Sequence, residues 1–202
     1  MKSAFSSSYS QRGSSLIEVL VTLVILMLGL LGLVGLMVQS QRSQMESYQR
    51  MQALVVLQDM VNRINTNRKA GDCYALAAAD GSGFLGTAGT GHAALPTACP
   101  AATPPITADQ QTRAISDLTQ WNNLLVGSAE VSSDGSNVGA MLGARGCITL
   151  VSAGVYQVSV VWQGGGKTVA PPTDVTCGTG LYDDETLRRA VSVPLQIADL
   201  SG

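Results

Sequence analysis

The sequence predicts an α+β protein in which one long amino-terminal helix packs on a small antiparallel sheet. Three observations lead to this prediction. Residues 16–38 are almost wholly apolar, and residues 39–67 keep a helical spacing without Pro or Gly. The last third of the chain alternates between apolar and polar residues, as half-buried strands do.

The apolar stretch from Leu16 to Val38 has Glu18 as its one charged residue and Thr22 as its one other polar residue. A helix of this length spans about 35 Å, enough to cross a hydrocarbon core of about 30 Å. An acid near the start of such a helix is favoured by the helix dipole. A secretory signal peptide has a shorter apolar core and is cut after it. The sequence therefore predicts a membrane-spanning segment that stays on the protein.

The helical spacing continues from Gln39 to Asn67, and Gly71 suits the end of the element. Apolar residues recur there at intervals of three and four, which predicts one stripe that packs as core. The members of this stripe are Met45, Tyr48, Met51, Leu54 or Val55, Leu57 or Gln58, Val61 and Ile64. We predict one helix from about Ser14 to about Asn67, apolar all round in its first half and amphipathic in its second.

A Gly-rich and Pro-rich stretch from Asp72 to Pro105 predicts a long loop. His92, the only histidine, lies in this loop without a neighbouring Cys, Asp or Glu, so we expect a solvated side chain and no metal ligand. A second helix should follow, because Thr107 and Gln110 have the spacing of a capping box. Trp121 is a candidate for the core face of this helix, and Gly127 ends it.

Three strands are expected after this helix, at residues 147–151, 156–162 and 191–197. A hairpin-sized turn at residues 152–154 joins the first two. Pro194 places the third strand at a sheet edge, because proline cannot donate to a central ladder. No helix separates these strands, so the sheet should be antiparallel.

All the cysteines lie beyond the apolar stretch, and their even number in a small exported domain predicts disulfides. They are Cys73, Cys99, Cys147 and Cys177. Four cysteines allow three pairings, and we predict the sequence-local one, Cys73–Cys99 with Cys147–Cys177, which closes two loops. No CxxC spacing occurs, which argues against a structural zinc site.

Several classes of function are disfavoured by the composition. The formal net charge of −2 is not that of a nucleic-acid-binding protein, which carries a basic patch. One histidine in a Gly-rich loop cannot form a hydrolytic triad, so we expect no catalytic residues, no metal and no cofactor. The acidic run Asp183-Asp184-Glu185 is expected to be a solvated turn.

A short polar leader with Lys2 and Arg12 ends in Gly13, and Ser14-Ser15-Leu16-Ile17 follows, with Glu18 in the fifth position. This arrangement resembles the class III signal of type IV prepilins. The resemblance implies cleavage between Gly13 and Ser14 by a prepilin peptidase on the cytoplasmic side, and methylation of the new amino group of Ser14. Ser14 departs from the Phe or Met that many major pilins have at this position.

The order of helix, loop, antiparallel sheet and disulfide-closed carboxyl region resembles the type IV pilin fold. Four later segments are similar to the PilV group of minor pilins, namely residues 117–121, 145–148, 156–164 and 187–189. The resemblance implies four parts. These are a leader at residues 1–13, a transmembrane and fibre-core half of the helix at 14–38, its amphipathic half at 39–71, and a periplasmic or extracellular head at 72–202.

The resemblance implies a single-pass inner-membrane protein with a cytoplasmic amino terminus that later enters an extracellular pilus. Its partners would be other minor and major pilins through the helix, the prepilin peptidase and the inner-membrane assembly machinery. The resemblance to the PilV group implies a role in starting assembly with other minor pilins, near the tip. Glu18 would pair with a Ser14 amine, either in its own helix or in an adjacent subunit, where the pair sets register.

Two other functions remain open from the sequence. One is a pseudopilin of a type II secretion system, which has the same architecture. The other is a membrane-tethered adhesin or binding module that makes its contact through the Gly-rich loop.

Overall fold

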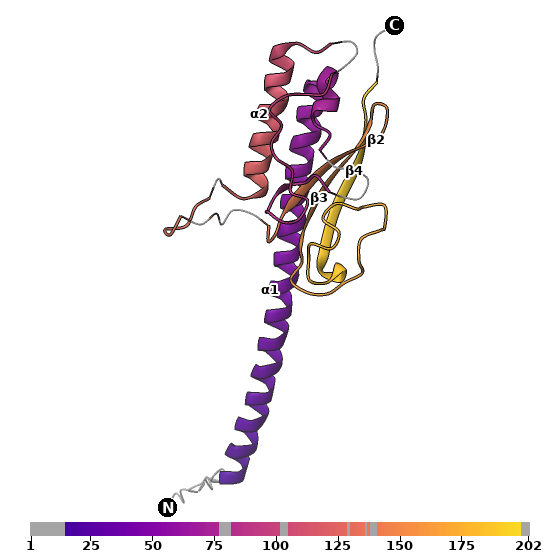
Figure 1. The fold of residues 1–202 in the computed structure, drawn as a ribbon. Coiled ribbons are helices and arrows are strands. Elements are labelled where there is room, and N and C mark those ends of the chain that lie inside the picture. The colour runs from indigo at the N-terminus through magenta and orange to yellow at the C-terminus, as the bar shows by residue number, and fades with distance from the viewer. Residues whose placement is uncertain are drawn as a thin grey trace, which may run out of the picture. The chain divides into compact units, whose positions relative to one another are not determined.

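The computed structural model describes residues 15–76, 82–101, 105–128, 130–135, 137 and 141–198. The chain forms two compact units, Met1–Gln44 and Met45–Gly202, which are described in turn. The elements of both units are labelled in Figure 1.

The first unit consists, in its described part, of the early turns of helix α1, which runs from Leu16 to Thr66. The carbonyl of Ser15 accepts the first bonds, from the amides of Glu18 and Val19 at 2.9 and 3.3 Å. Both ends lie within two residues of the predicted helix. The absence of Pro from this stretch explains why it continues without a break.

The second unit contains a four-stranded antiparallel sheet with the strand order β1-β2-β3-β4. The strands are β1 (Leu85–Gly86), β2 (Arg145–Ser152), β3 (Val155–Gln163) and β4 (Arg188–Gln196). The three strands predicted from alternation are present, and β4 is an edge strand as Pro194 indicated. Strand β1 lies in the stretch predicted as loop, because two residues are too few to show a period.

Helix α2 (Ala108–Leu125) runs alongside the later turns of α1 (Figure 1). Thr107 is its N-cap, and the predicted capping box is present: the Thr107 hydroxyl accepts from the amide of Gln110, whose side chain accepts from the amide of Thr107. The helix ends before Gly127, which has a φ of 67°. This left-handed conformation favours glycine and stops the helix.

The core of the second unit lies between α1, α2 and one face of the sheet. Trp121 on α2 is fully buried there and donates from Nε1 to the carbonyl of Val56 on α1 at 3.0 Å. Its ring lies against Gly146 of β2, where an added Cβ would stand 2.3 Å from the ring. Glycine at this position therefore lets the helix approach the strand closely.

The predicted core stripe of α1 is wrong in its first part. Met45, Tyr48, Met51 and Val55 are each more than 60% exposed, whereas Leu57 and Ile64 are buried as predicted. The buried face is made by Ala53, Val56, Leu57, Met60 and Ile64. Apolar residues occupy two faces of these turns, and spacing alone cannot tell which face meets the sheet.

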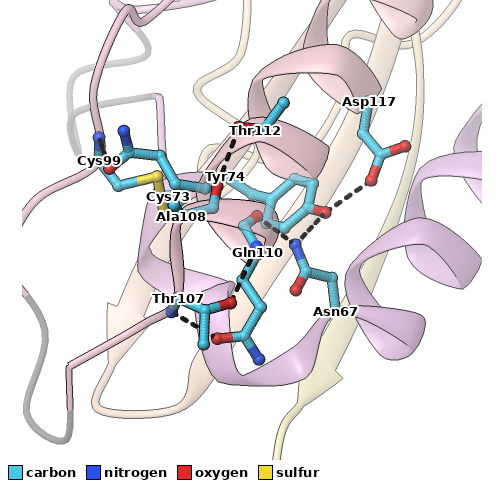
Figure 2. The surroundings of a disulfide bond; sticks show 10 residues. Asn67, Cys73, Tyr74, Cys99, Thr107, Ala108, Gln110, Thr112 and Asp117 are labelled. Atoms are coloured by element: carbon cyan, nitrogen blue, oxygen red, sulfur yellow. Dashed lines mark hydrogen bonds between the residues drawn. A yellow bond between two sulfur atoms is a disulfide. The ribbon is translucent and has the colours of Figure 1, made fainter.

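Two disulfides close loops in the second unit. Cys73 is joined to Cys99, and Cys147 is joined to Cys177, with Cα–Cα distances of 4.8 and 5.8 Å. This is the sequence-local pairing that we predicted. The first bridge, drawn in Figure 2, lies beside the start of α2. Closing loops of this length limits the freedom of the unfolded chain and stabilises the fold by about 3 kcal/mol per bridge.

Candidate functional site

The residues predicted to be cut and methylated, Gly13 and Ser14, lie outside the described residues. Glu18, the third predicted residue of this site, lies in the first turn of α1 and is exposed. An acid at this position faces the positive end of the helix dipole. No ion pair joins Glu18 to any residue of the described ranges.

From Leu16 to Val38 the surface of α1 is apolar on all sides apart from Glu18 and Thr22. Every side chain from Leu16 to Val38 is exposed, and the polar hydroxyl of Thr22 donates to the carbonyl of Val19 at 2.8 Å. Within the described residues, α1 is the one helix that is long and apolar enough to cross a membrane. A helix that is apolar all round is suited to lipid or to a bundle of similar helices.

A second exposed apolar strip lies on α1 within the second unit. Met45, Tyr48, Met51 and Val55 form this strip, at spacings of three and four residues, and Leu54 beside them is 42% exposed. The strip was predicted as core and is instead a surface. Its spacing is that of one helix face, so it suits contact with another helix.

A buried polar cluster joins α1 to α2, and sequence reasoning missed it. Asp117 on α2 accepts from Arg63 Nη1 at 2.9 Å and from the Tyr74 hydroxyl at 2.7 Å (Figure 2 shows the tyrosine contact). Asn67 completes the cluster by donating to the Tyr74 oxygen at 3.2 Å. Burial, followed by the hydrogen bond to Asp117, raises the pKa of Tyr74. The cluster satisfies its buried polar groups and fixes one helix on the other.

The Gly-rich loop considered for ligand contact is tied to the sheet. His92 is exposed as predicted, and its Nε2 also lies 3.2 Å from the carbonyl of Gly86. The buried guanidinium of Arg145 donates to the carbonyl of Ala88 at 3.1 Å and lies 5.3 Å from the Phe84 ring. These contacts hold the loop against the sheet, with residues 84–86 buried and residues 88–92 exposed.

The acidic run was predicted to be a solvated turn, and this prediction is wrong for two of its three residues. Those two make contacts that stabilise the fold. Asp184 caps the short helix Glu185–Leu187 and forms an ion pair with Lys167 at 2.5 Å. The hydrogen bonds from Lys167 and from Thr186 lower the pKa of Asp184. Glu185 binds the buried Arg188 at 2.7 Å. Only Asp183 matches the predicted solvated side chain.

The described ranges contain no group of three or more His, Cys, Asp or Glu side chains that could hold a metal ion. Among the described residues, the candidate site is the exposed surface formed by Glu18 and the apolar early turns of α1.

A family model described as the prokaryotic N-terminal methylation motif matches residues 9–34. This range includes Gly13, Ser14 and Glu18. No curated protein and no solved structure matches the chain. The motif, the exposed apolar helix and the pilin-like α+β head together support a type IV pilin or a pseudopilin-like protein.

Proposed function

We propose that this protein is a minor type IV pilin of the PilV group, which helps to start pilus assembly near the tip. The observation that supports this proposal most is the methylation motif at residues 9–34, which overlaps the part of α1, from Leu16 to Val38, where every apolar side chain is exposed. The leader at residues 1–13 is removed and Ser14 is methylated. Before assembly the protein is held in the inner membrane, with its head in the periplasm.

The proposed partners are other minor and major pilins, which bury the apolar turns of α1 against their own helices. In the fibre, helix packing keeps the apolar side chains of α1 out of water, where exposing them would cost roughly 25 cal/mol per Å². Glu18 then pairs with the Ser14 amine of a neighbouring subunit. A carboxylate in an apolar fibre core needs such a partner.

Mass spectrometry of the protein from its native host tests the processing step. We expect a mature chain that begins at a methylated Ser14. An intact Met1 in purified fibres would contradict the proposal. A Gly13→Glu variant puts a bulky charged side chain before the cut and should block the peptidase completely. Gly13→Ala is the control and should still be cut in part.

The second candidate is a pseudopilin of a type II secretion system, since the methylation motif supports both classes. Deletion separates the two candidates. Loss of surface pili with normal protein secretion supports the pilin, and blocked secretion with normal pili supports the pseudopilin. A tethered adhesin is the third candidate. Residues 88–92 of the Gly-rich loop are exposed, and contacts of His92 and Ala88 hold the loop to the sheet.

A further inference from the structure

One side of strand β4 carries backbone groups that β3 does not use. The ladder between the two strands continues at its ends, where Gly164 donates to Leu187 and Ile197 donates to Gly154, each at 2.8 Å. Hydrogen-bonded pairs alternate with non-bonded pairs in an antiparallel ladder. Counted from these two bonds, every second residue of β4 bonds to β3. The residues between them point their amides and carbonyls away from β3. This set contains Ala190, Ser192, Pro194 and Gln196.

The amides and carbonyls that point away from β3 form a free edge of the sheet. Strand β4 is last in the strand order, and among the described residues none forms a backbone hydrogen bond to Ala190 or Ser192 outside the ladder. Natural proteins usually protect such an edge with a bulge, a very short strand, a proline or a free charge. Here β4 has nine residues in unbroken register with β3. Pro194 protects one position, and the amides of Ala190 and Ser192 are left open.

An open groove of about 390 Å³ lies along this part of the edge. One wall is the segment Val169–Pro172 together with Val175, and the other is Arg188, Arg189, Ala190 and Ser192. Both arginine charges are already neutralised, since Arg188 binds Glu185 and Arg189 binds Glu46 at 2.7 and 2.8 Å. The groove therefore complements uncharged side chains and offers no free charge to attract an acidic ligand.

The size of the groove decides what kind of occupant fits it. Nine residues line it, whereas a stable interface between two folded proteins uses about 20–30 residues a side. The groove can therefore hold one extended segment of a chain that is kept nearby by other contacts. Two β4 edges cannot pair antiparallel in a fibre whose subunits all point the same way, because the two strands would have to run in opposite directions.

We propose that the free edge of β4 and its groove bind an extended, uncharged segment of a neighbouring fibre subunit by strand addition. This inference rests on the proposed function, since the helix contacts of the fibre supply the proximity. The added strand would bond to the amides and carbonyls of Ala190 and Ser192, and its alternate side chains would enter the groove. The backbone bonds would contribute affinity, and the small groove would select small apolar side chains.

A pair of variants at Ser192 tests the edge in the full chain, expressed in the source organism as its only copy. Ser192→Pro removes the outward amide without removing a bond to β3, as Pro194 already does two residues on. Ser192→Ala is the matched control, because it keeps the amide and loses the same hydroxyl contact to Ser159 at 2.9 Å. We expect Ser192→Pro to lower the ratio of fibre-bound to membrane-bound protein about tenfold relative to Ser192→Ala.

Hydrogen exchange on the wild-type chain gives a second measurement that does not depend on any variant. The amides of Ala190 and Ser192 should exchange fast in detergent-solubilised protein and slowly in sheared fibres. Equal exchange rates in both states, or equal incorporation of the two variants, would overturn strand addition and leave the pilin function intact. Slow exchange already in the purified protein would also overturn it, because its own chain or a second copy would then cover the edge. Absence of the wild type from fibres would reject the proposed function and this inference together.

Discussion

The early turns of helix α1 are apolar all round and exposed, whereas its later turns are amphipathic and bury one face. From Leu16 to Val38 every apolar side chain is exposed, whereas Ala53, Val56 and Met60 in the later turns are buried or nearly so. The later turns meet the sheet and α2 of their own chain. The early turns are apolar on all sides and exposed among the described residues, and such a surface is suited to lipid and to other helices.

The acidic residues of the head and of the early turns of α1 also differ in whether they have partners. In the head, Asp117 is 7% exposed and has partners from two elements, Arg63 and Tyr74. Glu18 has no ion-pair partner within the part of the chain that the structure describes. A carboxylate placed in an apolar environment without a partner is costly. The comparison predicts that head residues control stability of the folded chain, and that Glu18 controls entry into the assembly.

Neutralising Glu18 should have the largest effect. We expect Glu18→Gln to insert into the membrane, lose its leader and form both disulfides, yet to enter fibres at least about tenfold less than wild type, since a desolvated charge pair is lost. The measurement is the amount of protein in sheared fibres against the amount in membranes. Asp59→Asn, which changes a helix acid of the head, is the control and should enter normally. Equal incorporation of Glu18→Gln would reduce Glu18 to a helix-end acid.

Two methionines of α1 allow a matched test of the buried and exposed faces. Met60 is 0% exposed and Met51 is 62% exposed, on the same helix and in the same unit. Met60→Ala should lower the free energy of unfolding by about 2–5 kcal/mol, because it leaves a cavity in the core. Met51→Ala should change it by less than about 0.5 kcal/mol. Denaturant unfolding of the full chain in detergent, followed by Trp fluorescence, measures both. Equal losses would mean that the exposed strip is core after all.

The buried tyrosine should give the head a stability that depends on alkaline pH. The pKa of Tyr74 is raised in the folded state, so its contribution is complete below the ordinary tyrosine value of about 10 and is lost as the pH rises beyond it. Tyr74→Phe should cost about 1.5 kcal/mol at neutral pH, through the lost bond to Asp117, and should weaken the loss of stability above pH 10.

Unfolding curves at several pH values between 8 and 11 would measure this slope. Tyr48→Phe is the control, because the Tyr48 side chain is 63% exposed. An unchanged slope in Tyr74→Phe would show that other tyrosines cause the alkaline loss of stability. Tyr156, hydrogen-bonded to Asp72 at 2.5 Å, would then be the next candidate, since burial and this bond raise its pKa.

Local patterns predicted most of the elements in this fold. The capping box at Thr107, the alternation in β3 and the edge position of Pro194 each depend on a few neighbouring residues, and each is present in the structure. The sequence-local disulfides also follow from short loops. These features could be predicted because their physical cause lies within one segment.

Features made by distant segments could not be predicted in the same way. Arg113 and Asp117 have the spacing of an ion pair within α2, yet Asp117 binds Arg63, 54 residues away. The exposed strip at Met45 and Met51 escaped prediction because it requires knowing which helix face meets the sheet. The free edge of β4 depends on how β3 pairs with it. The available signal for the polar cluster was the four-residue spacing of Asp117 and Trp121, which puts an acid on the predicted core face of α2.

Removing the N-cap of α2 should have the smallest effect. The capping box at this N-cap belongs to the head and was predicted from four residues alone. Thr107→Ala removes the hydroxyl that accepts from the Gln110 amide at 3.2 Å, while the Gln110 side chain can still accept from the amide of residue 107 at 2.9 Å. Losing an N-cap acceptor typically costs about 1 kcal/mol.

Thr107→Ser keeps the acceptor and should restore nearly all of this stability, so the pair separates capping from the loss of a methyl group. Denaturant unfolding in detergent gives the difference, and fibre entry should be unchanged in both variants. A loss of fibre entry in Thr107→Ala alone would break the division between the two regions. It would mean that the start of α2 contributes to assembly as well as to the stability of the head.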